Sequence, residues 1–359
     1  MAVYFKGNQG ERGTYGAMAS ESEILCDSGP KSPSVNWNDT QYRRCVLAKL
    51  VEGVYILETY RHQYGDVPQG LALPSWDSCG FHLKEWLIDN DGIGKSIICA
   101  TYEYKSPSPD DPNIPQYVIA FRGTILKSKD TMFRDIEVNT QCVYNRLHKN
   151  PSFQNAMQYV QNQNTDALSR GASLWLAGHS LGSAMALLIG KKMARMDHFL
   201  ETYLFNPPFF SFSVNFELHI MKSVLKAGAS KLVPGIGRQH HEAQAHEDPF
   251  DKLSNWFPHL FVNRYDPICK VYIKYFKNRK KMEKIGMGKL ERHATKQSLM
   301  ELFTNVFGYS DSEAEALHLL PSVNLIINKG QFRRAHGIKQ WYNPSLSTEF
   351  HQYQYNPTT

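Results

Sequence analysis

The sequence predicts an α/β protein with a mostly parallel central sheet that is covered by helices on both faces. Two observations lead to this fold class. Short apolar or β-rich runs, typical of strands, alternate along the chain with longer runs of helical periodicity. The 359 residues are 42% apolar, which is enough to bury a sizeable core without covalent cross-links. Because each parallel connection needs a crossover, usually a helix, such an alternation favours a parallel sheet.

The first elements of this pattern lie in the N-terminal third. Residues 1–35 are rich in Gly, Ser and Glu and predict a flexible tail. In residues 41–64 apolar pairs recur at helical spacing, which predicts an amphipathic helix. The runs SIICATYEY (96–104) and YVIAF (117–121) are β-rich, and the turn-forming stretch SPSPDDPNIP separates them. We therefore expect two strands joined by an exposed loop.

The middle of the chain continues the alternation. Two stretches, 130–145 and 151–168, read as helices. They lead to SLWLA (173–177), which is too short and too apolar for anything but a buried strand. Residues 181–195 then return to helical spacing. This order is that of a strand followed directly by a helix.

The C-terminal half adds two apolar strands, TYLFN (202–206) and HLFVN (259–263). About fifty residues connect them, which is uncommonly long for a compact domain, so we expect a cap-like insertion within 209–258. Helices are predicted at 267–283, 294–307 and 313–327. The predicted domain spans 36–345 and is followed by a C-terminal tail, 346–359.

The composition narrows the class of protein. A net charge of +6 is mild for this length, and the basic run at 277–281 is typical of a solvated helix face, so no nucleic-acid partner is expected. The N-terminal residues lack the apolar core of a signal peptide, and no apolar span is long enough to cross a bilayer, which predicts a cytoplasmic location. The cysteines form no C-x-x-C pair, which favours reduced, buried thiols: Cys26, Cys45, Cys79, Cys99, Cys142 and Cys269.

A serine stands between two glycines in Gly178-His179-Ser180-Leu181-Gly182, after a predicted strand and before a predicted helix. A nucleophilic serine at such a sharp turn needs small neighbours, because its backbone is strained and its hydroxyl projects outward. The G-x-S-x-G pattern alone is weak, and its placement is what indicates a nucleophile. The alternative is that Ser180 is an ordinary helix N-cap.

A serine nucleophile needs a carboxylate and a base, which in α/β-hydrolases follow it in the order Asp, His. Asp266 comes just after the predicted strand 259–263, at the edge where open α/β sheets place functional groups. Alternatively, Asp266 caps the next helix, with Pro267 at its first position. Three other aspartates follow no convincing buried strand: Asp248, Asp251 and Asp311.

The best-placed base is His336, in a loop-like break beside Gly337. Its predicted role is to take the Ser180 proton and return it to the leaving group, while Asp266 holds the imidazole. The remaining histidines after Asp266 lie among charges, on a leucine-rich helix or near the C-terminus: His293, His318 and His351.

Catalysis also needs N–H donors aimed at the tetrahedral oxyanion. The backbone of Leu181, directly after the serine, supplies one. The second is predicted at Thr124, where the run YVIAFRGT leaves the sheet and Gly123 permits a close backbone approach. The alternative for Thr124 is a simple strand-ending turn.

Four motifs together resemble the class 3 lipase family of α/β-hydrolases: Phe121-Arg122-Gly123-Thr124, Gly178-His179-Ser180-Leu181-Gly182, Asn263-x-x-Asp266 and the late His336. Longer runs such as WLAGHSLG, LFNPPF, EDPF, LHLLPS and AHGIKQW are similar to the plant intracellular branch of that family. The resemblance covers roughly residues 36–345. It implies an α/β-hydrolase fold with the inserted segment after the strand that follows the nucleophile helix.

The resemblance also implies a serine esterase that acts on carboxylic esters of lipids, without a metal or an organic cofactor. Its triad would be Ser180, Asp266 and His336, and its oxyanion residues Thr124 and Leu181. Secreted fungal members carry an amphipathic lid after the oxyanion loop, whereas residues 126–130 are polar here, so the lid is absent or displaced. The aromatic residues at the ends of 209–258 either roof an acyl pocket or belong to the core. The histidine-rich run 239–248 is predicted to be a solvated loop rather than a metal site.

Three functions are compatible with these residues. The first is hydrolysis of a small-molecule or lipid ester through an acyl-serine intermediate. The second hands the same acyl group to an alcohol or amine, as an acyltransferase of specialised metabolism. The third is a non-catalytic binding protein on the hydrolase fold, although all three triad members are present. Peripheral membrane contact and the oligomeric state stay open.

Overall fold

The computed structural model describes residues 35–65, 67, 74–89, 96–106, 113–123, 151–209, 252–284, 320–330, 332 and 334–355. The chain divides into two units, Met1–Asn36 and Trp37–Thr359. All the helices and strands below belong to the second unit.

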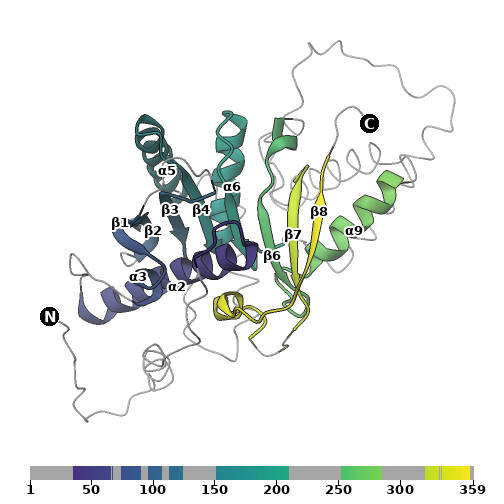
Figure 1. Ribbon diagram of the computed structural model, residues 1–359, viewed down its shortest axis with the longest axis horizontal. Helices are drawn as coiled ribbons and strands as arrows, with labels where there is room; N and C mark the ends of the chain where they lie inside the picture. The colour runs from purple at the N-terminus through teal and green to yellow at the C-terminus, as the bar shows by residue number, and fades with distance from the viewer. Residues whose placement is uncertain are drawn as a thin grey trace, which may run out of the picture. The chain divides into compact units, whose positions relative to one another are not determined.

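Among the described residues, an eight-stranded sheet forms the centre of this unit, with its strands in the order β1 to β8 (Figure 1). The strands are β1 (Phe81–Asp89), β2 (Ser96–Tyr104), β3 (Tyr117–Phe121), β4 (Leu174–His179), β5 (Thr202–Phe205), β6 (His259–Asn263), β7 (Val323–Asn328) and β8 (Thr348–Tyr353). Strands β3 to β7 are parallel to one another. Only β2 and β8 run against the other six strands. The predicted mostly parallel α/β-hydrolase sheet is therefore confirmed.

The helices are α2 (Thr40–Tyr64), α3 (Pro74–Asp77), α5 (Pro151–Ser169), α6 (Leu181–Arg195) and α9 (Val271–Lys284), with short 3₁₀ helices η3 (Leu253–Asn255) and η4 (Ile338–Tyr342). The parallel strands follow one another in sequence order, and right-handed crossovers that all move the same way place their helices on the same face of the sheet. Accordingly, α5, α6 and α9 share one apolar core, and α2 and η4 share the other.

The two cores receive alternate residues of each strand. In β3, Ile119 and Phe121 join the core beneath α6, whereas Val118 and Ala120 join the core beneath α2. All five residues of this strand are buried. A strand covered on both faces is expected to be apolar throughout, which explains why YVIAF and SLWLA could be recognised as strands.

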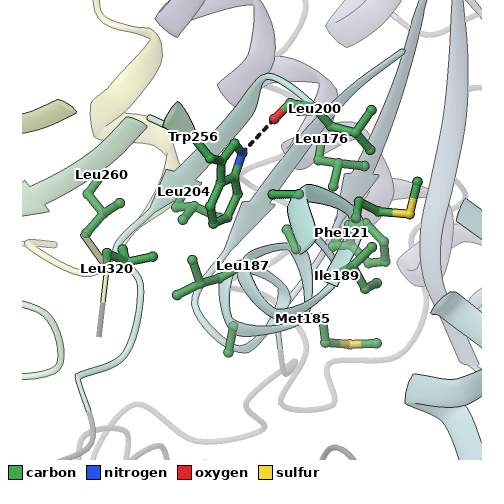
Figure 2. Close-up of a cluster of buried hydrophobic side chains, with 14 of the residues drawn as sticks. Phe121, Leu176, Met185, Leu187, Ile189, Leu200, Leu204, Trp256, Leu260 and Leu320 are labelled. Atoms are coloured by element: carbon green, nitrogen blue, oxygen red, sulfur yellow. Dashed lines mark hydrogen bonds between the residues drawn. The ribbon is translucent and has the colours of Figure 1, made fainter. Parts of the chain in front are cut away.

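The α6 face is closed by Trp256, whose ring lies among leucines of the central strands and α6 (Figure 2). Its Nε1–H donates to the carbonyl oxygen of Leu200 at 2.9 Å. The ring approaches α6 so closely that a Cβ on Gly190 would lie 2.6 Å from Trp256 Cζ2. At the other end of the predicted insertion, Phe209 packs edge-on against Tyr272. Phe209 and Trp256 therefore belong to the core, and residues 210–251 lie outside the described part of the chain.

The α2 face contains a buried arginine that fixes the segment after η4. The Arg44 guanidinium donates to the carbonyl oxygens of Trp341 (2.9 Å) and Asn343 (2.7 Å). Arg44 is 1% exposed, so its charge is compensated by these backbone dipoles rather than by water. This contact anchors the segment that carries η4 against α2.

Two predicted elements are wrong. Within the helix expected at 313–327, residues Val323–Asn328 form β7, which pairs with β6 and β8 and buries Val323, Leu325, Ile326 and Ile327. The tail expected at 346–359 contains β8, a half-exposed edge strand. Its mostly polar residues lack the apolar run that would predict a buried strand. Strand β1 was not predicted for the same reason. The predicted helix 267–283 begins only at Val271, and the predicted helices 130–145 and 294–307 lie outside the described residues.

Two further predictions concern cysteines and membranes. The four described cysteines, Cys45, Cys79, Cys99 and Cys269, are buried and free, while Cys26 and Cys142 lie outside the described ranges. None of the described helices combines the length and apolarity that a bilayer crossing requires.

Candidate active site

Ser180 occupies the turn between β4 and α6 in a strained backbone conformation. Its φ is 54° and its ψ is −124°, a region that non-glycine residues rarely adopt. The neighbouring strand β5 holds this turn, because the Ser180 N–H donates to the Phe205 carbonyl oxygen at 3.0 Å. The serine side chain makes no capping hydrogen bond to α6. The reading of Ser180 as an ordinary N-cap therefore fails, and its hydroxyl is left for other partners.

The two flanking glycines are required by contact distance. A Cβ on Gly178 would lie 2.4 Å from the carbonyl oxygen of Gly182. A Cβ on Gly182 would lie 2.5 Å from the carbonyl oxygens of both Phe121 and Arg122. These neighbours are backbone atoms, which cannot swing aside as a side chain would. The turn Gly178–Gly182, called the elbow below, is therefore built by backbone packing that excludes any side chain at either glycine.

The structure brings Ser180, His336 and Asp266 together, as the sequence analysis expects. Ser180 Oγ lies 2.9 Å from His336 Nε2, and His336 Nδ1 lies 2.8 Å from Asp266 Oδ2. Their exposed fractions are 6%, 6% and 0% for Ser180, His336 and Asp266. An ionised carboxylate only accepts, so Nδ1 carries the imidazole proton and Nε2 is free to accept from the serine hydroxyl.

The two oxygens of Asp266 have different partners. Oδ2 accepts from His336, from Asn206 Nδ2 at 2.6 Å and from the Cys269 thiol at 3.1 Å. Oδ1 accepts from the Ile268 N–H at 3.0 Å, so the carboxylate also caps the turn before α9. Asp266 therefore contacts the predicted base through one oxygen and caps a turn through the other, whereas α9 begins only at Val271 and not at Pro267.

The charge of Asp266 is stabilised despite its burial. Burial alone would raise the pKa of this carboxyl. The His336 ring, together with the hydrogen bonds from Cys269 and Asn206, outweighs that effect and holds the pKa of Asp266 below its ordinary value. The carboxylate thus stays ionised at neutral pH.

An amide network stabilises the loop that carries His336. Gln340 of η4 donates through Nε2 to the carbonyl oxygens of Ala335 (2.7 Å) and Gly337 (2.9 Å), on either side of the histidine. Its Oε1 accepts from Asn263 and Asn328, each at 2.7 Å. These two asparagines are the last residues of β6 and β7. The ends of two strands therefore fix the position of one glutamine, which fixes the loop.

A third asparagine, Asn206, follows β5 with a φ of 47°, a left-handed conformation that asparagine tolerates better than most residues. Its Nδ2 reaches both Asp266 and the Ala335 carbonyl oxygen (2.9 Å). Its Oδ1 accepts from Trp341 Nε1 at 2.5 Å. Asn206 is fully buried and connects the acid with the loop of the base.

The two predicted oxyanion donors belong to the start of α6 and to the residues just after β3. Leu181 and Gly182 are the first residues of α6, and N–H groups of a first helical turn have no intrahelical acceptor. Gly123, the last described residue after β3, lies against the elbow, since a Cβ there would be 2.9 Å from Ser180 Cβ. The predicted second donor, Thr124, lies outside the described residues.

Arg122 anchors this end of β3. Its guanidinium donates to the carbonyl oxygens of Ile97 (2.5 Å) and Gly123 (2.7 Å). Glu58 of α2 lies 3.9 Å from the Arg122 guanidinium and accepts from the Ile97 N–H at 2.8 Å. Glu58 and Arg122 therefore hold the strand end against α2.

Some competing residues from the sequence analysis can be placed. His351 lies on the edge strand β8 and contacts Glu349 Oε1 at 2.6 Å. In the sheet, β5, β6 and β7 separate β8 from β4, the strand that leads to Ser180. The other candidates and the histidine-rich run 239–248 lie outside the described residues: His293, His318, Asp248, Asp251 and Asp311.

The residues that hold the site, above all Asn206 and Gln340, are not predicted from the sequence. One signal was present, because three apolar runs end alike in TYLFN, HLFVN and NLIIN. Since parallel strands end at the same edge of a sheet, three terminal asparagines indicate a shared polar cluster. Nothing in the sequence indicates Gln340, which reaches the cluster from η4.

Comparisons with known proteins agree with this geometry. Residues 112–214 match the family described as Lipase (class 3). A GDSL esterase/lipase of Arabidopsis thaliana is 37% identical over an alignment that covers 94% of this chain and 99% of that protein. This chain contains no Gly-Asp-Ser-Leu tetrapeptide, and its motif serine lies in GHSLG.

A solved structure, brefeldin A esterase, described as a bacterial homologue of human hormone sensitive lipase, covers 86% of this chain and 94% of its own. Its identity is 16% and its TM-score 0.32, too low to inform the site. The close plant relative and the matched family model have ester hydrolysis in common. The chain belongs to the class 3 lipase family of α/β-hydrolases and is a carboxylic ester hydrolase.

Proposed function

We propose that the chain hydrolyses small-molecule or lipid carboxylic esters through an acyl-serine intermediate on Ser180. The observation that carries this proposal is the continuous contact from Ser180 Oγ to His336 Nε2 and from His336 Nδ1 to Asp266. The strained backbone of Ser180 supports it, because strain of this kind persists where a side chain must be projected into a site.

In the first half-reaction, Ser180 Oγ attacks the carbonyl carbon of the ester while His336 Nε2 takes the hydroxyl proton. The ionised Asp266 stabilises the imidazolium that forms and keeps Nδ1 protonated. Collapse of the tetrahedral intermediate breaks the bond to the alcohol oxygen, and His336 returns the proton to that leaving alcohol. The acyl group is then bound to Ser180.

In the second half-reaction, His336 takes a proton from water, whose oxygen attacks the acyl carbon. Collapse releases the carboxylic acid and restores the Ser180 hydroxyl with the proton from His336. In both halves the negative oxygen is stabilised by the Leu181 N–H, at the positive end of α6, and by Thr124 as the second donor. The position of Thr124 directly after Gly123, which touches the elbow, supports this role.

The test is turnover of a soluble, activated ester together with labelling by a fluorophosphonate. Ser180→Ala, His336→Asn and Asp266→Asn should each lower kcat by at least about a thousandfold. The matched control is Ser169→Ala, an exposed serine at the end of α5, which should behave like wild type. Equal turnover by wild type and Ser180→Ala would overturn the proposal. Failure of the folded protein to label at Ser180 would support the non-catalytic binding alternative instead.

A further inference from the structure

Two polar side chains near the site have no role in the proposed chemistry. Tyr55 lies on α2, and His179 is the last residue of β4, directly before Ser180. The Gly123 N–H donates to Tyr55 Oη at 2.7 Å, and Tyr55 Oη lies 2.8 Å from His179 Nδ1. His179 Nε2 in turn lies 2.7 Å from the carbonyl oxygen of His336. Three contacts thus connect the end of β3 with the backbone of the base.

The direction of each hydrogen bond follows from which groups can donate. A carbonyl oxygen only accepts, so His179 Nε2 must carry a proton. The Tyr55 oxygen accepts from Gly123, and its single hydrogen points to His179 Nδ1, which accepts. Every donor and acceptor in this series of hydrogen bonds is therefore satisfied when His179 is neutral in this one tautomer.

The surroundings keep His179 neutral. Burial, and secondarily the neighbouring His336, lower the pKa of His179 to about 3. The two imidazole rings lie 5.1 Å apart between centroids. A charged His179 would oppose the positive charge that His336 acquires when it takes a proton. A neutral ring can hold the base without competing with it.

This series of hydrogen bonds joins two backbone groups of the site, the Gly123 N–H and the His336 carbonyl oxygen. Gly123 packs against both Ser180 Cβ and the His179 carbonyl oxygen, so its position sets the oxyanion side of the elbow. The His336 carbonyl belongs to the residue whose ring contacts Ser180 Oγ. These backbones belong to different loops, separated by more than two hundred residues in sequence. Without Tyr55 and His179 they have no direct polar contact among those that the structure describes.

We propose that Tyr55 and His179 are positioning residues that act as one hydrogen-bonded unit. This unit fixes the oxyanion side of Ser180 relative to the backbone of His336. The inference rests on the proposed function of Ser180 and His336. It assigns to the conspicuous histidine of the GHSLG motif a role other than acid–base catalysis. Geometry of this kind matters because a displacement of about 1 Å in a catalytic group can lower the rate about a hundredfold.

The experiment uses four variants of the full chain. Tyr55→Phe removes only the hydroxyl, and His179→Leu removes both ring partners. The conservative His179→Gln keeps one acceptor and one donor. The control is Tyr102→Phe, because the buried Tyr102 hydroxyl has no hydrogen-bond partner in the described structure. The readouts are kcat and KM for a soluble ester, the rate of fluorophosphonate labelling at Ser180, and the melting temperature.

We expect Tyr55→Phe to lower kcat and the labelling rate about tenfold to a hundredfold while KM changes less than about twofold. His179→Leu should lose at least as much, and His179→Gln should recover most of it. The double variant of Tyr55→Phe and His179→Leu should be no slower than His179→Leu alone, because both changes break the same unit. Tyr102→Phe should match wild type.

Two results overturn the inference. One is wild-type kcat in a folded Tyr55→Phe variant. The other is a double variant whose loss is the product of the two single losses. If a leucine variant does not fold, Tyr55→Phe and His179→Gln still decide between the outcomes. Absence of labelling at Ser180 in wild type would instead contradict the proposed function, so the two failures are distinguishable.

Discussion

Two parts of the proposed site are held in different ways: the elbow, which is the turn around Ser180, and the region of Asp266 and His336, called the acid–base side. At the elbow, Gly178 and Gly182 let backbone atoms approach to distances that no Cβ would allow. On the acid–base side, Asn206 and Gln340 hold Asp266 and the loop of His336 through side-chain hydrogen bonds. The elbow is therefore sensitive to added volume, and the acid–base side is sensitive to changed polarity.

This difference follows from how each region is formed. The elbow lies within continuous backbone from β4 into α6, so its geometry is set by local sterics. Asp266 and His336 follow different strands, β6 and β7, and must be brought together across the sheet edge. Buried polar groups that meet this way need complete hydrogen bonding, because an unsatisfied one costs about 1–3 kcal/mol.

The largest expected effect is that of Gly182→Ala. The added Cβ would collide with the carbonyl oxygens of Phe121 and Arg122, so β3 and α6 would have to separate. We expect a loss of about 3 kcal/mol in the free energy of unfolding, measured by urea denaturation, and loss of ester turnover.

Gly171→Ala is the control for this collision. Gly171 has a φ of 65°, but nothing lies within 4 Å of an added Cβ. Its substitution should cost only the backbone strain, about 1–2 kcal/mol. Equal losses for Gly182→Ala and Gly171→Ala would show that close packing does not hold the elbow.

The next effect concerns polarity at unchanged volume. Asn206→Asp would place a second carboxylate 2.6 Å from Asp266 Oδ2, where the amide now donates. Like charges raise a carboxyl pKa, so Asp266 would stay protonated to higher pH and would hold His336 less well. We expect kcat at neutral pH to fall about a hundredfold and the acidic limb of the pH–rate profile to move to higher pH.

Asn162→Asp, an exposed change on α5, is the matched control and should leave the profile in place. An unchanged profile for Asn206→Asp would mean that polarity around Asp266 is not what fixes the acid–base side.

A smaller effect is the pH dependence of stability. The pKa of Asp266 is lower in the folded chain than its ordinary value of about 4. Its contribution to stability is therefore present above pH 4 and is lost as the pH falls below that value towards the folded-state pKa. Wild type should lose stability more steeply than Asp266→Asn between about pH 5 and pH 2, by urea denaturation at each pH. Parallel curves would contradict a lowered pKa for this carboxyl.

The smallest expected effect is that of Ser183→Ala in α6. The Ser183 hydroxyl lies 2.7 Å from the Gly178 carbonyl oxygen and 2.8 Å from that of Phe205. The Phe205 oxygen also accepts from the Ser180 N–H, so it keeps a partner. Thermal denaturation should give a loss of about 1 kcal/mol, with kcat lowered less than about threefold. A large loss of kcat would show that hydrogen bonds, and not only packing, hold the elbow.

The sequence predicts strands that are apolar throughout and helices with regular apolar spacing. Strand β3 is recognisable as YVIAF because it is buried on both faces, and α6 has the predicted bounds, Leu181–Arg195. Strands β1 and β8 are not predicted, because each is an edge strand in which polar and apolar residues are mixed. The residues of β7 are predicted as helix, since a short, largely apolar run fits either a helix or a strand.

The residues of the candidate site also differ in whether local sequence predicts them. Ser180, Asp266 and His336 could be chosen from local motifs, chain order and strand ends, and the structure brings them together. Gln340 and Tyr55 could not be chosen, because their importance depends on which loops meet in space. A helix residue of ordinary type carries no local signal of a distant partner.

The most direct test of the central claim is detection of the acyl group on Ser180. Turnover of an activated ester by the full chain is quenched in acid during the steady state, and the peptide containing Ser180 is examined by mass spectrometry. The expected result is that this peptide gains the mass of the acyl group, and that the adduct is absent in Ser180→Ala and strongly reduced in His336→Asn. An adduct on another residue, or undiminished turnover without any adduct on Ser180 in the presence of the ester, would contradict it.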